Sequence, residues 1–280
     1  MSKVITVAGV QSNPKILEKE KNLEKCLESI KIASKEGAKL IVFPECSLTG
    51  YCFSSLEEVT TVAETIPGPS VNAIASLCKE LEVYAVVGLV EKEGDQYFNA
   101  LAILGSDGFV GKYRKLHLPY LGLDRFVAHG DMPLRVFETA VGKLGGLICF
   151  DTRFPEATRV LALLGAEIVV LPTNWPKGAD LVPKYVVNTR AYENRVHYIA
   201  INRVGRERGF QFIGQSKIIH CSGVTLAEAS VSKEEIIYAQ ISPKEARIKH
   251  VVIQKNKFEL PLFKERRPEF YKLLSAKPET

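Results

Sequence analysis

The chain of 280 residues lacks the features that mark membrane-spanning and secreted proteins. No apolar run approaches the roughly 18 residues of a membrane span. The first residues, MSKVITVAGVQ, alternate in polarity like a strand and do not form the apolar core of a signal peptide. We therefore expect a cytoplasmic protein with no membrane partner.

Cysteine and histidine are sparse as well, at six and five residues. No two cysteines form a CxxC pair, and no spacing of cysteine and histidine resembles a zinc site. The pattern excludes a disulfide framework and predicts reduced thiols. We expect no bound metal and no other cofactor.

The net charge of +5 resides in residues 243–280, which hold ten basic and five acidic side chains and leave the rest formally neutral. A basic segment can bind nucleic acid, but Glu259, Glu265 and Glu269 interrupt this one. We interpret residues 251–280 as an extension that contacts a partner subunit, not nucleic acid. It follows a single predicted domain, residues 1–250.

Apolar periodicity predicts an alternation of strands and helices, as in an α/β protein. The predicted strands are Val4–Val10, Leu40–Phe43, Tyr84–Val90, Tyr97–Leu104, Phe109–Tyr113, Leu144–Ile148, Ile168–Leu171, Val196–Ile201, Ser216–Ile219 and Glu235–Ile241. The predicted helices are Leu23–Gly37, Pro69–Leu81, Glu156–Gly165 and Pro183–Arg195.

One short pattern occurs twice: GAKLIVFPE at residues 37–45 and GAEIVVLPT at residues 165–173. Both combine a helix stop, a buried strand and a proline. The repetition suggests two similar halves whose strands end on the same side, which would bring Glu45 and the loop Thr173–Trp175 to a common site. A chance likeness of short apolar runs is the alternative.

Cys149 is the candidate nucleophile. It lies where VGKLGGLICFDTRFPE (residues 141–156) turns from a buried strand toward a helix. Such an elbow exposes a thiol beside free backbone N–H groups, here that of Phe150, which can hold an oxyanion. Taken alone, a cysteine in this position is more often a buried structural residue than a nucleophile.

Two charged residues also lie at strand ends. Glu45 directly follows a buried strand, and Lys115 leaves the predicted hairpin and enters a stretch to Pro133 without clear periodicity. A carboxylate and a lysine together can activate a thiol. Each could instead be an ordinary surface charge.

Three motifs, FPE, YRKLHLP and ICFDTRFPE, carry a resemblance that covers nearly the whole chain. In this order and spacing, the chain resembles the amidase branches of the nitrilase superfamily of carbon-nitrogen hydrolases. The resemblance implies a four-layer α-β-β-α sandwich of the nitrilase type. It also implies a homodimer or higher homo-oligomer, with C-terminal segments crossing between subunits.

By the same resemblance, Glu45 is the general base, Lys115 the electrostatic group and Cys149 the nucleophile. Family members usually carry a second glutamate in the loop after the lysine. In this chain the loop reads LHLPYLGLDRF, and the nearest carboxylate is Asp124, one methylene shorter. Asp124 is thus a possible supporting carboxylate.

The expected reaction is hydrolysis of a small amide with release of ammonia. True nitrilases generally have tryptophan and glutamate after the cysteine, and this chain has Phe150 and Asp151, so amides are favoured over nitriles. Hydrolysis of a nitrile or an N-carbamoyl compound by the same triad is the alternative. A catalytically silent scaffold is another, although all three triad residues are present.

A Cys149–His117 dyad is a competing arrangement, but the sequence marks no third residue that would orient His117. The expected substrate pocket comprises Tyr51, Arg153, Asn174 and Trp175. Arg153 would bind a substrate carboxylate, as in ω-amidases, or it pairs with Asp151 or Glu156 and is purely structural. Trp175 would offer an apolar wall, which favours an uncharged amide.

Overall fold

The computed structural model describes residues 4–276. Two six-stranded sheets form its centre. The first sheet has the order β14 (Glu235–Ile241), β1 (Ile5–Gln11), β2 (Ala38–Val42), β3 (Tyr84–Glu93), β4 (Gln96–Gly105), β5 (Gly108–Arg114). The second has the order β13 (Thr225–Glu228), β12 (Lys217–Ile219), β9 (His197–Asn202), β8 (Ile168–Thr173), β7 (Gly142–Gly146), β6 (Val136–Thr139).

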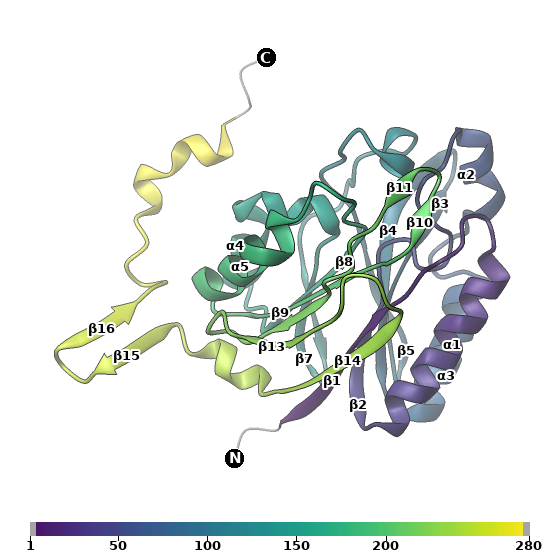
Figure 1. Cartoon of the computed structure of the whole chain (residues 1–280). Helices are drawn as coiled ribbons and strands as arrows, with labels where there is room; N and C mark the ends of the chain where they lie inside the picture. Colours follow the sequence, from purple (N-terminus) through teal and green to yellow (C-terminus); the bar gives the residue numbers. More distant parts are fainter. Residues whose placement is uncertain (1–3, 277–280) are drawn as a thin grey trace.

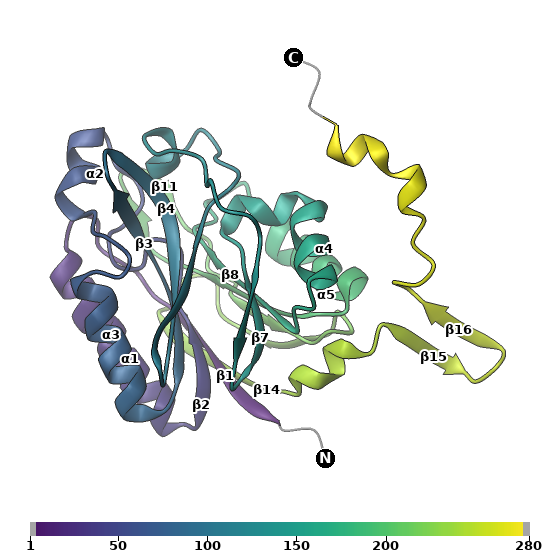
Figure 2. The same ribbon diagram turned by 180° about the vertical axis from the view of Figure 1, so that it is seen from behind.

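Helices cover the outer face of each sheet (Figures 1 and 2). Helices α1 (Lys19–Lys35) and α3 (Pro69–Leu81) lie on the first sheet, and α4 (Pro155–Leu163) and α5 (Val187–Asn194) lie on the second. The inner faces of both sheets share one apolar core, to which Val42 and Leu101 contribute from one side and Val170 and Ile199 from the other. The chain thus has the expected four-layer α-β-β-α arrangement.

The strands follow the predicted pattern because those buried on both faces are continuously apolar. In β2 and β8, for example, every residue except Lys39 is buried. Helix α3 and strand β14 have the predicted bounds, whereas the predicted strand Leu144–Ile148 ends at Gly146. The predicted helix Pro183–Arg195 begins as a π-helix (η3, Val182–Val186) and continues as α5.

Several elements were not predicted because they are short. These are the two edge strands β6 and β13 of the second sheet, α2 (Leu56–Val62), the hairpin β10 (Arg206–Glu207) with β11 (Phe210–Gln211), and the short helices η1 (Gly122–Arg125), η2 (Cys149–Arg153), η4 (Pro243–Arg247), η5 (Pro268–Phe270) and η6 (Lys272–Ser275). No helix in residues 4–276 combines the length and apolarity needed to cross a membrane.

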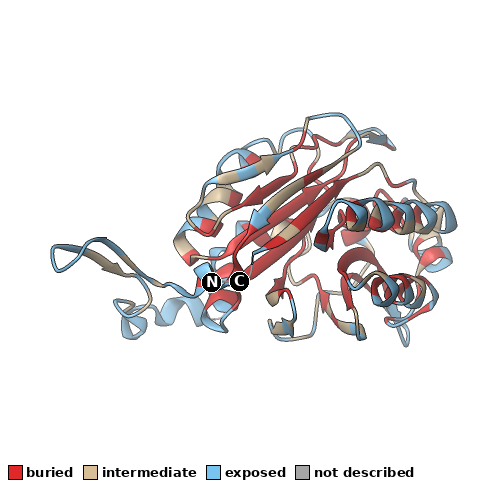
Figure 3. Ribbon diagram, turned by 90° about the horizontal axis from the view of Figure 1, so that it is seen from below, coloured by how far each residue is buried: buried red, intermediate tan, exposed pale blue. Residues whose placement is uncertain are grey.

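The C-terminal segment leaves the body of the molecule (Figure 1). Its residues show no apolar periodicity long enough to predict an element that folds alone. The segment nevertheless forms a hairpin, β15 (His250–Gln254) with β16 (Phe258–Pro261), followed by η5 and η6. Figure 3 shows the segment as largely exposed. The last four residues of the predicted extension lie outside the described residues.

Candidate active site

Glu45 lies in the loop that follows β2. Position 88 in the neighbouring strand β3 must be glycine, because a Cβ there would lie 2.5 Å from the Cys46 nitrogen and 2.8 Å from the Pro44 oxygen. The loop therefore packs directly on β3. The Glu45 side chain is buried, and its Oε1 accepts a hydrogen bond from Lys115 at 2.7 Å. Its Oε2 is buried without a hydrogen-bond partner.

Lys115 follows the last residue of β5, and its backbone N–H donates to the Asn99 carbonyl at 2.8 Å. Its ammonium group is fully buried between Glu45 and Asp124, with Nζ 2.5 Å from Asp124 Oδ2. Burial alone would lower the pKa of Lys115, but the negative charges of Asp124 and Glu45 hold it well above its usual value. Lys115 is thus a fixed cation.

Asp124, whose role the sequence left open, belongs to the same cluster. It lies in η1, where Tyr51 donates to its Oδ2 at 2.8 Å and Asn99 donates to its Oδ1 at 2.8 Å. The Asn99 amide also donates to Glu45 Oε1 at 2.7 Å. Two carboxylates therefore share one lysine and one amide, and the cluster carries a formal charge of −1.

This arrangement makes Glu45 a stronger base than an exposed glutamate. Burial raises its pKa; Lys115 acts in the opposite direction, and the charge of Asp124 raises the pKa further. Burial is the largest effect, so the net shift is upward. A carboxylate with a raised pKa can take a proton and later return it near neutral pH.

Cys149 begins the 3₁₀ turn η2 with a backbone φ of +45°. Few residues other than glycine adopt this left-handed conformation, and at a strand-to-helix turn it presents the side chain outward. The thiol is nearly buried. Burial and the charge of Glu45 together raise its pKa to about 12, although the charge of Lys115 acts in the opposite direction. Cys149 therefore holds its proton at neutral pH and needs a base to form the thiolate.

A pocket of about 350 Å³ opens over Cys149. The predicted residues Tyr51, Phe150, Arg153, Asn174 and Trp175 all line it. Trp175 is held rigidly, because its backbone N–H donates to the Asn202 side chain at 2.8 Å. A larger hollow of about 640 Å³, between α4 and the C-terminal segment, is lined by no cysteine. The candidate site is therefore identified by the cysteine and polar residues that line the smaller pocket, and not by pocket volume.

Arg153 lies at the exposed edge of the pocket together with Lys177, which the sequence did not indicate. One of the two acidic side chains considered as partners of Arg153 is engaged elsewhere. Asp151 is buried and accepts hydrogen bonds from Tyr113 at 2.8 Å and from the Ile148 backbone at 2.9 Å.

The expectation that no third residue orients His117 is wrong. The sequence marked no residue that would orient it, but its Nδ1 lies 2.7 Å from Asp151 Oδ1 and its ring stacks on Phe154 at 3.7 Å. The described residues nevertheless contain no hydrogen bond between His117 and Cys149, and His117 does not line the pocket. Asp151 therefore orients His117, but His117 has no hydrogen bond to Cys149 among the described residues, as a Cys149–His117 dyad would require.

Asn99 is the residue of the cluster that sequence reasoning missed. It lies in β4, where it is the polar member of a buried run that includes Phe98, Ala100 and Leu101. A buried amide inside an apolar strand needs hydrogen-bond partners, and this requirement was the available signal.

The sequence matches the family described as carbon-nitrogen hydrolase over residues 6–248. It is 41% identical to a protein of Pyrococcus abyssi named nitrilase, covering 96% of this chain and 99% of that one. It is 33% identical to a protein of Francisella tularensis named citrullinase, covering 95% and 96%.

Solved structures agree with this match. A carbon-nitrogen hydrolase from Helicobacter pylori superposes with a TM-score of 0.81 at 26% identity, covering 98% of this chain and 99% of that one. An amidase from Nesterenkonia shares the fold with a TM-score of 0.80 at 22% identity, covering 96% of each chain. The chain therefore belongs to the carbon-nitrogen hydrolases of the nitrilase superfamily and is an enzyme.

Proposed function

We propose that this enzyme hydrolyses a small amide through a thioester on Cys149 and releases ammonia. The observation that carries the proposal is the state of the Glu45 carboxylate beneath the pocket. Its Oε1 is bound to Lys115, and its Oε2 is buried without a partner. A buried acceptor without a hydrogen-bond partner lowers the stability of the fold. Its presence here therefore favours a functional role, and accepting the proton of the Cys149 thiol is such a role.

The steps follow from the residue types. Glu45 takes the Cys149 proton, and the thiolate attacks the amide carbon. Lys115 and the backbone N–H of Phe150 hold the oxyanion. When the C–N bond breaks, Glu45 returns the proton to the leaving nitrogen, and ammonia departs. Glu45 then deprotonates a water, which cleaves the thioester to give the acid and the free thiol.

Asp124 serves as the supporting carboxylate. It keeps Lys115 charged and in place, and its negative charge contributes to the raised pKa of Glu45. No step of this scheme requires a metal or another cofactor.

A panel of substrates with one acyl chain tests the proposal: the primary amide, the N-carbamoyl compound and the nitrile. We expect ammonia release to be fastest from the amide, with an acyl adduct on Cys149 in the intact mass of quenched enzyme. Absence of ammonia from all three would contradict the proposal. Faster ammonia release from the nitrile would favour a second candidate function, nitrile hydrolysis, which the Pyrococcus abyssi relative named nitrilase supports.

The substrate pocket supports a small amide with a carboxylate at its far end. Arg153 and Lys177 place two exposed cations at the edge of the pocket, and a guanidinium binds a carboxylate through two parallel hydrogen bonds. Trp175 forms an apolar part of the wall of the same pocket and suits the aliphatic part of such a substrate.

A homodimer is part of the proposal, with residues 251–280 as an extension that contacts the partner subunit. Helices α4 and α5, which cover the second sheet, expose apolar side chains, among them Val160, Leu163 and Tyr192. The segment beyond residue 250 exposes Phe258, Leu273 and others of the same kind. Unpaired apolar surface of this extent is typical of a subunit interface. The six free thiols are in keeping with a cytoplasmic location.

A further inference from the structure

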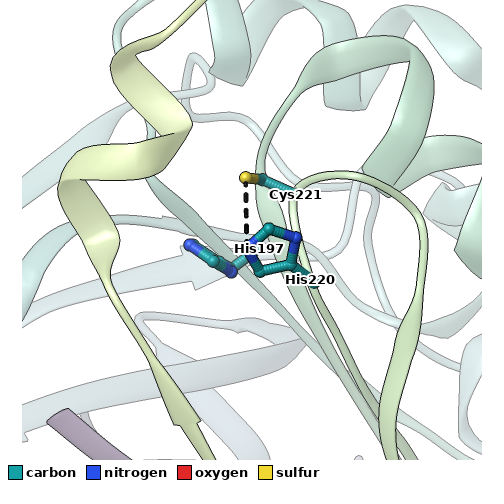
Figure 4. Close-up of side chains that lie close together, drawn as sticks. All are labelled: His197, His220 and Cys221. Atoms are coloured by element: carbon teal, nitrogen blue, oxygen red, sulfur yellow. Dashed lines mark hydrogen bonds between the residues drawn. The ribbon is translucent and has the colours of Figure 1, made fainter. Parts of the chain in front are cut away.

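A cluster of metal-ligand side chains lies on the second sheet, away from the pocket. His197, His220 and Cys221 each offer one donor atom, and these atoms lie within 4.8 Å of one another (Figure 4). Strand register explains the meeting. Ile219 pairs with Tyr198 where β12 runs antiparallel to β9, so the next residues, His220 and His197, face each other with ring centroids 5.0 Å apart.

The cluster is separate from the catalytic residues. His197 is the first residue of β9, whereas Asn202, which supports Trp175 of the pocket, is its last. Five steps along a strand amount to roughly 17 Å. The mechanism uses none of the three clustered residues.

His197 is prepared to act as a ligand. Its Nε2 lies 3.0 Å from the Ser242 carbonyl, which can only accept, so Nε2 carries the proton and Nδ1 carries the lone pair. That Nδ1 is buried with no hydrogen-bond partner, and the side chain is fully buried. Metal-bound histidines are held in the same way, through a hydrogen bond from the other ring nitrogen.

The other donors complete a mixed set. Cys221 is buried, with its Sγ 3.9 Å from His220 Nε2. His220 Nδ1 accepts from the Ser222 backbone N–H at 3.2 Å and lies 2.8 Å from Ser222 Oγ, so Nε2 carries the proton and donates to Glu245 Oε2 at 2.8 Å. A metal on Nε2 would replace this proton, and Nδ1 would then donate to Ser222 Oγ. The Glu245 carboxylate therefore lies beside the same nitrogen that would bind a metal, and can supply an oxygen.

We propose that His197, His220 and Cys221 form a binding site for a zinc-class divalent cation, and that the Glu245 carboxylate, which contacts His220 but lies outside this group of three donors, moves in as the fourth ligand. Two nitrogens, a sulfur and a carboxylate oxygen are the donors that Zn²⁺ takes, usually in a tetrahedron. Bond lengths of about 2.0–2.3 Å give tetrahedral edges of roughly 3.3–3.8 Å. The three clustered donors, now within 4.8 Å of one another, must therefore close by about 1 Å, and Glu245 must move further than they do. The half-exposed His220 and Glu245 provide this movement and an entry path.

The charges around the site permit a cation. Cys221 would bind as the thiolate, because a thiol that coordinates a metal ion loses its proton. A thiolate and a carboxylate neutralise Zn²⁺, while Lys249 is held away by the carbonyls of Asn194 and Arg195 at 2.9 and 2.7 Å. The ion would join β9, β12 and η4, and would fix the start of the C-terminal segment.

Sequence spacing could not show this site. His220 and Cys221 are adjacent, but His197 comes from another strand and Glu245 from a later turn. Register and folding bring them together.

Cobalt titration of the full chain tests the proposal, in a Cys149→Ser background so that the nucleophile cannot bind the metal. We expect one Co²⁺ per chain, with a thiolate-to-metal charge-transfer band that Zn²⁺ abolishes. Cys221→Ser should remove the band. Cys78→Ser, a matched buried thiol in α3 on the opposite layer, should keep it.

Two further variants keep the test decisive if Cys221→Ser does not fold. His220→Gln, at a partly exposed position, should weaken Co²⁺ binding at least tenfold, and Glu245→Gln should weaken it less. Zn²⁺ should also raise the melting temperature of the Cys149→Ser protein but not that of the His220→Gln version. No band, or a band that survives removal of Cys221 or His220, overturns the proposal.

Discussion

The side-chain amide of Asn174 donates to the backbone carbonyl of Glu45 at 2.9 Å. This bond joins the rim of β8 to the rim of β2, which belong to different sheets. Because both segments follow the repeated sequence pattern, the proposed base and one wall of the pocket come from equivalent places in the two halves. The nucleophile follows β7, next to β8, and completes the site from the second half.

Cys149→Ser and Glu45→Gln should each remove nearly all turnover and leave the fold intact. Loss of a general base alone costs about 10²–10⁴-fold, and the residues act as one unit, so the double variant should be little worse than either single variant. Ammonia release measures the effect, and circular dichroism checks the fold. Substantial activity in either variant would overturn the assignment.

Lys115→Ala differs, because it leaves Glu45 and Asp124 buried without their shared cation. We expect loss of turnover together with a fall in the free energy of unfolding, about 3–5 kcal/mol for a buried ion pair that loses one partner. Urea unfolding measures the second effect. Unchanged stability would mean that Lys115 is not a member of the buried cluster.

Asp124→Asn tests the supporting role through pH. The proposed mechanism needs Glu45 ionised, so activity falls as the pH drops through the raised pKa of Glu45. Removing the charge of Asp124 lowers that pKa, so the acid limb of the pH profile of kcat/KM should move to lower pH. Asp124→Glu, which restores the charge, is the control. An acid limb that stays in place would exclude an electrostatic role for Asp124.

The sequence predicted most of the two sheets, because strands buried on both faces are apolar runs that end at proline or glycine. It also placed Glu45, Lys115 and Cys149 at strand ends. It missed Asn99, because one polar residue in an apolar strand resembles a defect until its partners are known. It also missed the pairing of His197 with His220, since strand register, not local pattern, determines that contact.

His117→Ala should retain most of the activity. His117 is bound to Asp151 and stacked on Phe154, and it has no hydrogen bond to Cys149 among the described residues. Its removal takes one hydrogen bond from the buried Asp151 Oδ1, which keeps the hydrogen bond from the backbone N–H of residue 117 at 3.1 Å, so only a small fall in melting temperature is expected. Steady-state kinetics decide the matter: a collapse of kcat while Lys115→Ala remains active would favour the histidine dyad.

A chain that ends at residue 250 should have a lower oligomeric state than the full chain. The removed segment exposes several apolar side chains that one subunit does not cover, and the hollow between it and α4 has apolar side chains on both sides, among charged ones. Light scattering measures the mass. An unchanged mass with normal stability would show that the segment is not part of an interface, and salt-dependent binding of DNA to the full chain would revive the nucleic-acid alternative.

Arg153→Lys should separate a carboxylate-bearing amide from an uncharged one. We compare a succinamate-like substrate with an uncharged amide of equal length, because both meet Trp175 and Cys149 in the same way. If Arg153 binds the carboxylate, the acid substrate should lose more in kcat/KM, since lysine cannot form the two parallel hydrogen bonds of a guanidinium. Lys177→Met, which removes the second cation at the pocket edge, should reduce the same preference through charge alone and therefore be more sensitive to salt. Equal losses for both substrates in both variants would exclude the carboxylate and leave the apolar wall of Trp175 as the determinant of specificity.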